Sequence, residues 1–279
     1  MTPYPLEGVV SWNMNTTCNY RCSYCTQRFL DDRAAWARDL PRFIAGFARL
    51  PGDWEVTLSG GEPSLHRGFG ELVEALAAQG RRVSMVTHFS APDEVYARFA
   101  RATAARPGLV SASLHLEYTT PEALRERLLR FAGGYAGRVM VTCVATRDTL
   151  PHLPDIARAL APLRLGVQPE KYDRDVIAYT PAEREQLLAL GGHTGSGHID
   201  PDLSGRPCWA GARYLVVDHR GEAWRCYPAR RKRTERLGNL LDGTLRLGNP
   251  PEPCRYTYCN CTVPQQRGMV VTDRAPAGA

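Results

Sequence analysis

The 279-residue sequence predicts an α/β fold built on an open, curved parallel sheet. Strand-like and helix-like segments alternate between residues 8 and 190, which indicates a succession of βα units. There are six such units, fewer than the eight of a closed barrel, so we expect a partial (β/α)6 TIM-like barrel. In this architecture the functional loops follow the carboxyl ends of the strands.

Each element is predicted from its own pattern. The strands are runs rich in β-branched residues, at 9–14, 54–60, 82–88, 109–118, 138–146 and 163–169. The second helix has one apolar face, formed by Phe69, Leu72, Val73, Leu76 and Ala77. Two later helices begin at the capping sequences TTPE (119–122) and TPAE (180–183).

A change of composition near residue 190 predicts a domain boundary. The stretch GGHTGSG at 191–197 is typical of a linker, and we expect the nearby His193 and His198 to face solvent rather than bind metal. The expected organisation is a barrel domain at 1–190, a linker at 191–205, a small cysteine-rich module at 206–265 and a disordered tail at 266–279.

Composition and charge exclude several classes of protein. Hydrophobic residues make up 43% and charged residues 23%, which is ordinary for a globular chain. No signal peptide and no apolar run of membrane-spanning length is visible, so we expect a cytoplasmic protein without a membrane partner. The net charge of +6 includes one dense run, ARRKRTER at 229–236. We interpret this run as a solvated face, and we expect no nucleic-acid partner.

The cysteines carry the strongest chemical signal. Their odd number and clustering favour metal or redox chemistry over a disulfide scaffold; they are Cys18, Cys22, Cys25, Cys143, Cys208, Cys226, Cys254, Cys259 and Cys261. The first three lie in CNYRCSYC, directly after the first predicted strand. Three thiolates hold three irons of a four-iron cluster and leave one iron with an open position. Zinc is the alternative, although this triplet is not a usual zinc pattern.

CNYRCSYC resembles the C-x3-C-x2-C signature of the radical S-adenosylmethionine (SAM) enzymes, and GGEP at 60–63 resembles their second motif. The resemblance covers most of residues 8–190. It implies a [4Fe-4S] cluster on the three cysteines, with the amino and carboxylate groups of SAM on the open iron. Reductive cleavage of SAM then gives a 5′-deoxyadenosyl radical, which abstracts hydrogen from a substrate. The resemblance also implies an electron donor of the flavodoxin or ferredoxin type.

The resemblance assigns further residues to cofactor binding. The segment Gly60, Gly61 and Glu62 would receive the amino group of SAM, because two glycines allow close backbone approach. Tyr24 would neighbour the adenine. A looser match places the remaining candidates at strand ends, namely Thr87, His88, Ser113 and Gln168. Polar residues at a barrel mouth are the alternative interpretation of these four.

The C-terminal cysteines resemble a second module. Cys208, twelve residues, Gly221, four residues and Cys226 resemble the opening of the SPASM and twitch modules, and GNLLDG at 238–243 resembles a later segment of them. The full SPASM form has seven cysteines and this region has five, which favours the twitch form with one auxiliary [4Fe-4S] cluster. The implied cofactors are therefore two [4Fe-4S] clusters and SAM.

Five cysteines leave one over for four ligand positions, and the sequence does not assign Cys254, Cys259 and Cys261. Our hypothesis is that Cys259 and Cys261 join Cys208 and Cys226 as ligands. Cys254, which stands apart from the tight CNC pair, would then donate a hydrogen atom to a substrate radical. The alternatives are that the extra thiol is structural, or that Cys143 is only a small core residue.

The substrate is expected to be a small molecule, because the cluster motif begins at residue 18 with no segment the size of a leader-binding domain before it. Some peptide-modifying members lack that domain, so peptides remain an alternative. Compact twitch-bearing members include enzymes that tailor aminoglycosides and related hydroxylated compounds, and the Arg, Pro, Ala and Gly bias is compatible with antibiotic biosynthesis. Four carboxylates at or past strand ends could bind an amino sugar or cyclitol or accept its proton, unless they are merely surface groups: Glu117, Glu170, Asp173 and Asp175.

Two outcomes follow from hydrogen abstraction. A thiol that returns hydrogen to the opposite face makes the enzyme an epimerase, whereas an auxiliary cluster that accepts an electron makes it an alcohol dehydrogenase. The surplus cysteine favours epimerisation. Crosslinking or epimerisation of a ribosomal peptide is a further alternative. A non-catalytic iron–sulfur electron carrier fits the cysteines but leaves GGEP unexplained.

Overall fold

A computed structural model describes residues 7–172, 175–190, 203–249, 251–257, 259, 263 and 267–271. Its main element is a sheet with the strand order β12-β11-β10-β1-β2-β3-β4-β5-β6. The strands from β1 to β6 are parallel and neighbour one another in chain order: β1 (Gly8–Asn15), β2 (Trp54–Gly60), β3 (Arg82–Thr87), β4 (Pro107–Leu114), β5 (Arg138–Ala145) and β6 (Arg164–Pro169). The predicted α/β class with a parallel sheet is confirmed.

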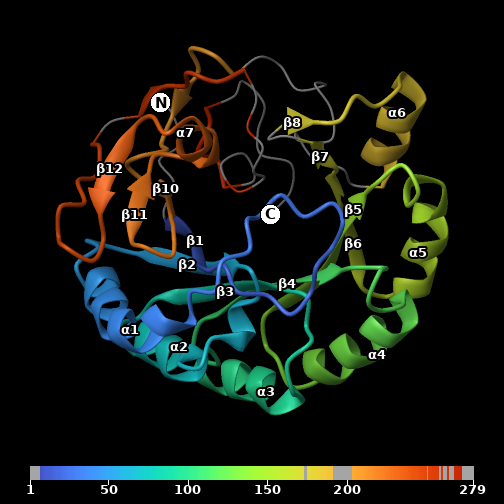
Figure 1. The fold of residues 1–279 in the computed structure, drawn as a ribbon, viewed down its shortest axis with the longest axis horizontal. Coiled ribbons are helices and arrows are strands. Elements are labelled where there is room, and N and C mark those ends of the chain that lie inside the picture. Colours follow the sequence, from blue (N-terminus) through green and yellow to red (C-terminus); the bar gives the residue numbers. More distant parts are fainter. Residues whose placement is uncertain are drawn as a thin grey trace.

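Helices connect successive strands and cover the convex side of the sheet (Figure 1). They are α1 (Arg33–Ala48), α2 (Phe69–Ala78), α3 (Asp93–Ala102), α4 (Pro121–Ala132), α5 (Leu153–Leu160) and α6 (Pro181–Ala189), with short 3-10 turns η1 (Pro63–Leu65) and η2 (Leu150–His152). A two-stranded ribbon, β7 (Lys171–Tyr172) and β8 (Asp175–Val176), follows β6.

The two faces of the sheet differ in chemistry because side chains alternate along each strand. On β1, Val10, Trp12 and Met14 face the helices. The ring of Trp12 lies 4.4 Å from that of Phe43 and 4.9 Å from that of Phe47 on α1. The residues between the helix-facing ones point to the concave side. Val86, Leu109, Met140 and Val144 are among them, but many are polar: Ser11, Asn13, Asn15, Thr57, Ser59, Ser84, Ser111, Ser113, Thr142 and Gln168. Branched apolar side chains fill a closed barrel, whereas this concave face presents hydrogen-bonding groups.

The C-terminal region continues the same sheet. Strand β10 (Tyr214–Val217) pairs in parallel with β1, from Val9 opposite Tyr214 to Trp12 opposite Val217. Strands β11 (Glu222–Trp224) and β12 (Arg236–Asn239) then add antiparallel neighbours. The region also holds α7 (Tyr227–Lys232) and a small pair formed by β9 (Pro207–Cys208) and β13 (Glu252–Pro253). The cysteine-rich segment is therefore joined to the edge of the barrel sheet by backbone hydrogen bonds.

Several predicted boundaries need correction or fall outside the described residues. The strand expected at 109–118 ends at Leu114, because residues 115–118 form a turn in which the N–H of Tyr118 donates to the carbonyl of His115 at 2.9 Å. Thr120 caps α4 as predicted, accepting from the N–H of Ala123 at 3.2 Å. The stretch GGHTGSG, with His193 and His198, lies outside the described residues.

Part of the segment expected to be a disordered tail is ordered. The N–H of Trp209 donates to the carbonyl of Met269 at 2.8 Å, and Val270 forms a bridge with Cys208. Arg267 forms an ion pair with Glu55, a concave-face residue near the amino end of β2 that is 3% exposed. Ser84 also donates to Glu55, at 2.6 Å. The segment 267–271 thus supplies the countercharge for a carboxylate buried at the base of the barrel.

Replacing Arg267 with alanine should therefore destabilise the fold. Glu55 would lose its ion pair in a buried position, and we expect the free energy of unfolding to fall by about 1–3 kcal/mol. Arg98, which binds Glu74 where both side chains are about half exposed, provides the matched control: Arg98→Ala should cost less than about 1 kcal/mol. Urea unfolding of both variants measures the difference, and equal effects would contradict the proposed role of Arg267.

Candidate active site and a cysteine-lined cavity

The three-cysteine motif and the GGEP motif are joined by backbone hydrogen bonds. At the carboxyl ends of β1 and β2, the N–H of Gly61 donates to the carbonyl of Asn15 at 2.8 Å, and the N–H of Glu62 donates to the carbonyl of Thr17 at 2.9 Å. The side-chain amide of Asn15 donates to the carbonyl of Glu62 at 2.8 Å. The chain entering the cysteine loop is therefore bonded directly to the GGEP segment.

The two glycines are required by this contact. A Cβ on Gly60 would lie 2.3 Å from the carbonyl oxygen of Asn15, and one on Gly61 would lie 2.1 Å from that of Thr17. Gly60 also has φ +139°, in the region that favours glycine. The sequence suggested that glycines here allow close approach of SAM; the structure shows that they allow close approach of the cysteine loop.

Glu62 is fully buried and its carboxylate is saturated by protein donors. One oxygen accepts from the N–H and hydroxyl of Ser64 (3.0 and 2.6 Å) and from the hydroxyl of Thr87 (2.7 Å). The other accepts from the N–H of His88 at 2.9 Å and lies 3.3 Å from the ring Nε2 of His88. The side chains of Glu62 and Thr87, both expected to contact the cofactor, thus hold the ends of β2 and β3 together.

The three cysteines of the first motif lie over this framework. Cys18 and Cys22 are half-buried and Cys25 is exposed, and none forms a disulfide. The Sγ of Cys18 lies 3.6 Å from Nε2 of His88, and the Sγ of Cys22 lies 3.3 Å from Nδ1 of His115. Burial, followed by the charge of Glu117, raises the pKa of Cys22 to about 11. Binding of iron by these thiols must therefore displace protons.

An aromatic stack supports the cysteine loop. The ring of Tyr20 lies between His88 (3.8 Å, 13°) and Tyr118 (4.0 Å, 6°). The predicted adenine neighbour Tyr24 has its hydroxyl 2.8 Å from Nδ1 of His115. Burial, and then the nearby His88, lowers the pKa of His115 to about 4, so its imidazole is neutral near pH 7. Sequence reasoning missed Tyr20, His115 and Tyr118, although their positions inside the motif and just past β4 were available signals.

The other predicted residues are placed as follows. Glu117 accepts from the N–H and the hydroxyl of Ser23 at 3.1 and 2.7 Å, so it braces the cysteine loop from the β4 side. Ser113 and Gln168 are half-buried on the concave faces of β4 and β6. Glu170 is half-buried just past β6. Asp173 lies outside the described residues, and Asp175 lies in β8.

The residues present fit a [4Fe-4S] cluster and SAM. Three unbonded thiols on one loop provide three of the four ligands that such a cluster needs. Two polar atoms buried in this region lack any hydrogen-bond partner, Nδ1 of His88 and Oδ1 of Asn15. Buried polar atoms usually have partners, so these orphaned atoms are consistent with a polar ligand beside them.

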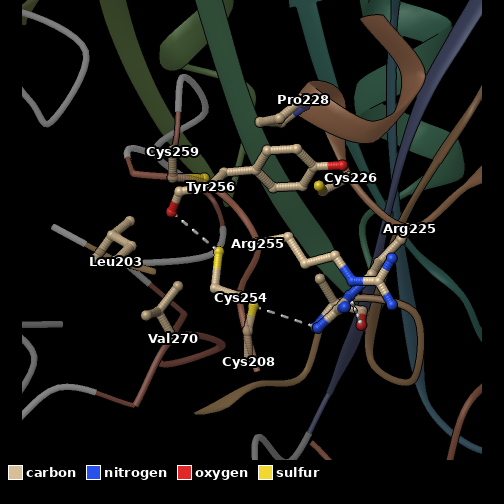
Figure 2. Close-up of a pocket in the computed structure, with 11 residues that line it drawn as sticks. Leu203, Cys208, Arg225, Cys226, Pro228, Cys254, Arg255, Tyr256, Cys259 and Val270 are labelled. Atoms are coloured by element: carbon tan, nitrogen blue, oxygen red, sulfur yellow. Dashed lines mark hydrogen bonds between the residues drawn. The ribbon is translucent and has the colours of Figure 1, made fainter. Parts of the chain in front are cut away.

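A second group of thiols lines a small cavity in the C-terminal region (Figure 2). It contains Cys208 from β9, Cys226 just before α7, Cys254 just after β13, and Cys259. Three of the four are buried, and Cys254 is half-buried. Burial raises the pKa of Cys208 to about 11 and that of Cys226 to about 12.

Cys254 stands apart from the other C-terminal cysteines in sequence but not in space. Cys254 lines the same cavity as three predicted ligands, with its Sγ 3.5 Å from the carbonyl of Tyr256. Cys261 lies outside the described residues, and Cys143 is buried in the core on the helix-facing side of β5. In the described part of the chain, no three His, Cys, Asp or Glu side chains are grouped as for a single metal ion. Thiolates of a four-iron cluster stand farther apart, because each binds a different iron.

Comparison with known protein families supports the interpretation of the three-cysteine site. The model of the Radical SAM superfamily matches residues 12–139, which include the cysteine loop and GGEP. These residues run from β1 into β5. The match supports a [4Fe-4S] cluster and SAM as the ligands of the first site. No helix among the described residues is long and apolar enough to cross a membrane.

Individual relatives share parts of this domain or its fold. The 7-carboxy-7-deazaguanine synthase of Rhodospirillum rubrum is 39% identical over 87 residues, which cover 30% of this chain and 36% of the relative, so the chain spans about a third of its length. Native anSMEcpe with bound AdoMet and Cp18Cys peptide has a TM-score of 0.54 at 15% identity, covering 85% of this chain and 78% of that one. Streptococcus suis SuiB bound to its precursor peptide SuiA has a TM-score of 0.56 at 14% identity, covering 87% and 65%. The two structures show a shared fold.

The contact between the motifs predicts the effect of Gly61→Ala. The added methyl group would collide with the carbonyl of Thr17, displace the cysteine loop and reduce iron bound at the first site at least several-fold. Gly134→Ala is the control, because its Cβ would meet only ordinary contacts at 3.9 Å. Iron and sulfide content, together with the cluster EPR signal that responds to SAM, measures the effect. Full loading of Gly61→Ala would contradict this role of the glycine.

Proposed function

We propose that the chain is a radical SAM enzyme that abstracts hydrogen from a small, polar, hydroxylated substrate held on the concave face of its barrel. The observation that carries the proposal is the position of the three-cysteine loop at the carboxyl edge of a sheet whose concave face is lined by hydrogen-bonding side chains. When bound, the cluster and SAM supply a 5′-deoxyadenosyl radical. An external electron donor of the flavodoxin or ferredoxin type would supply the electron.

The polar concave face supports a sugar or aminocyclitol as the substrate class. Serine, threonine, asparagine and glutamine side chains can pair with hydroxyl groups, whereas a wall of branched apolar residues could not. Ser113 and Gln168 are half-buried there, where a ligand could reach them. Glu170 stands at the rim beside β6 and could pair with an amino group. Glu117 is bonded to Ser23, which supports a role in holding the loop.

We propose that an auxiliary [4Fe-4S] cluster is bound by Cys208, Cys226, Cys254 and Cys259, the four thiols that line one cavity. This assignment replaces Cys261 by Cys254 in the expected ligand set. The cavity adjoins the barrel interior, since the hydroxyl of Tyr227, next to Cys226, donates to Oδ1 of Asn13 on the concave face of β1 at 3.2 Å. That proximity supports electron exchange between a substrate in the barrel and the auxiliary cluster.

The ligand assignment changes which outcome is favoured. With Cys254 bound to iron, Cys261 is the surplus thiol, and Cys143 faces the helices. Oxidation of an alcohol needs only the auxiliary cluster as electron acceptor and a base for the hydroxyl proton. Among the described residues every thiol outside the first motif, apart from Cys143, lines this cavity, so none is left there as a hydrogen donor, and this supports an alcohol dehydrogenase. Epimerisation is the second candidate and would use Cys261, rather than Cys254, as the hydrogen donor.

Isotope transfer tests this function. The reduced, reconstituted protein should convert SAM to methionine and 5′-deoxyadenosine, whereas Cys18→Ala, lacking one ligand of the first cluster, should not. With aminocyclitols or amino sugars deuterated at single carbons, label should enter 5′-deoxyadenosine from one position. In D2O, oxidation should leave no solvent deuterium at that carbon, and epimerisation should add one atom. Failure of the loaded protein to cleave SAM would contradict the proposal.

Removing single cysteines tests the auxiliary ligand set. Cys254→Ala should lose most of the iron held at the C-terminal site, because a ligand is missing. Cys143→Ala removes a thiol of the helix-facing core and should retain the iron. Iron and sulfide analysis in a background with Cys18, Cys22 and Cys25 replaced by alanine isolates this site. Equal iron in both variants would remove Cys254 from the ligand set.

Peptide modification is an alternative supported by the structural comparison. Both anSMEcpe and SuiB were solved with a peptide bound, and each covers at least 85% of this chain. A substrate peptide would have to enter the same concave face as an extended segment. Deuterium transfer from a labelled precursor peptide, with none from any amino sugar or cyclitol, would favour this alternative.

A further inference from the structure

Arg225 is a buried arginine in the wall of the cysteine-lined cavity. It is 5% exposed and directly precedes Cys226. Its Nε donates to the carbonyl of Ala210 at 2.9 Å, and its Nη2 donates to the carbonyl of Glu252, also at 2.9 Å. Its Nη1 lies 2.9 Å from a carboxylate oxygen of Glu235 and 3.2 Å from one of Glu252. Each nitrogen of the guanidinium therefore has a partner.

These partners belong to the segments that carry the thiols. Ala210 lies two residues after Cys208, and Glu252 lies two residues before Cys254. Cys226 is the next residue after Arg225 itself. One side chain thus connects the backbones of three cysteine-bearing segments that are remote in sequence. Backbone hydrogen bonds also join two of these segments, since the N–H of Cys254 donates to the carbonyl of Arg206 and the N–H of Gly205 donates to the carbonyl of Cys254, both at 2.8 Å. The side chain of Arg225 adds a link from both of them to the segment of Cys226.

The geometry requires arginine rather than any cation. The planar guanidinium presents donors in fixed directions, so it can bond two carbonyls and a carboxylate at once. A lysine ammonium would keep the charge but could not reach all three groups. Burial of the charge is tolerated because Glu235, itself nearly buried, pairs with it. Arg225 also lines the cavity, which places its charge beside the cysteine thiols.

We propose that Arg225 is a positioning and redox-tuning residue of the auxiliary cluster, an inference that rests on the proposed cluster at this site. Its hydrogen bonds hold the segments of Cys208, Cys226 and Cys254 in place before iron binds. Its charge then stabilises the reduced cluster. A four-iron cluster with four thiolates is anionic and gains one more negative charge on one-electron reduction, so a nearby cation raises the reduction potential.

Two substitutions separate these effects. Arg225→Lys keeps the charge but loses the planar guanidinium with its several donors. Cluster occupancy should therefore fall several-fold, while the reduction potential of the clusters that do form changes little. Arg225→Met loses both and leaves Glu235 without its buried partner, so occupancy should fall and the potential should become more negative. Arg236→Lys is the matched control, because Arg236 is half exposed and pairs with Glu222 away from the cavity. It should match the parent in both measurements.

The measurements are iron and sulfide content and an EPR-monitored redox titration. They use the full chain with Cys18, Cys22 and Cys25 replaced by alanine, so that the auxiliary cluster is observed alone. Absence of iron from this parent would overturn the proposed auxiliary cluster itself. If the parent binds iron and Arg225→Lys binds as much of it, the positioning role is overturned. If the reduction potential of the cluster in Arg225→Met equals that of the parent, the tuning role is overturned. If Arg225→Met does not fold, the reduction potential of the auxiliary cluster is measured in Arg225→Gln, which also removes the charge.

Discussion

The architecture of the active site depends on one backbone contact, in which residues 60–62 lie directly against residues 15–17. Two hydrogen bonds and two missing Cβ atoms bring the end of β2 against the start of the cysteine loop. The buried carboxylate of Glu62 extends this contact to β3 through Thr87 and His88. The three thiols are therefore attached to a rigid corner of the sheet rather than to a free loop, although Cys25 itself is exposed.

The position of β10 beside β1 joins the cysteine-rich segment to the barrel sheet. Both the first cysteine loop and the C-terminal strands are connected to β1, the first at its carboxyl end and the second along its edge. Tyr227, which lies between the cavity residues Cys226 and Pro228, reaches the concave face through its hydrogen bond to Asn13. In Figure 1 the C-terminal strands continue the curve of the barrel beyond β1. This continuity makes an arrangement with two redox centres and one substrate site physically reasonable.

The sequence predicted the strands, helices and motifs that depend on local sequence patterns. The parallel strands follow from β-branched runs, α2 from its apolar stripe, and the proposed iron site from three cysteines on one loop. It could not predict contacts made between distant segments. Glu62 was expected to face the cofactor, but its environment is set by donors on β3 as well as on its own turn. Cys254 looked separate because sequence distance does not report that β13 pairs with β9. The roles of Tyr20 and Arg225 depend likewise on partners that only folding brings together.

The most direct test of the account is whether SAM binds the iron that the three thiols leave open. Pulsed ENDOR on the reduced first cluster, in a variant with Cys226 and Cys254 replaced by alanine, isolates this centre. SAM labelled with ¹⁵N in its amino group and ¹⁷O in its carboxylate should give hyperfine couplings from both nuclei. Absence of both couplings in a fully loaded, reduced sample with saturating SAM would contradict the central claim.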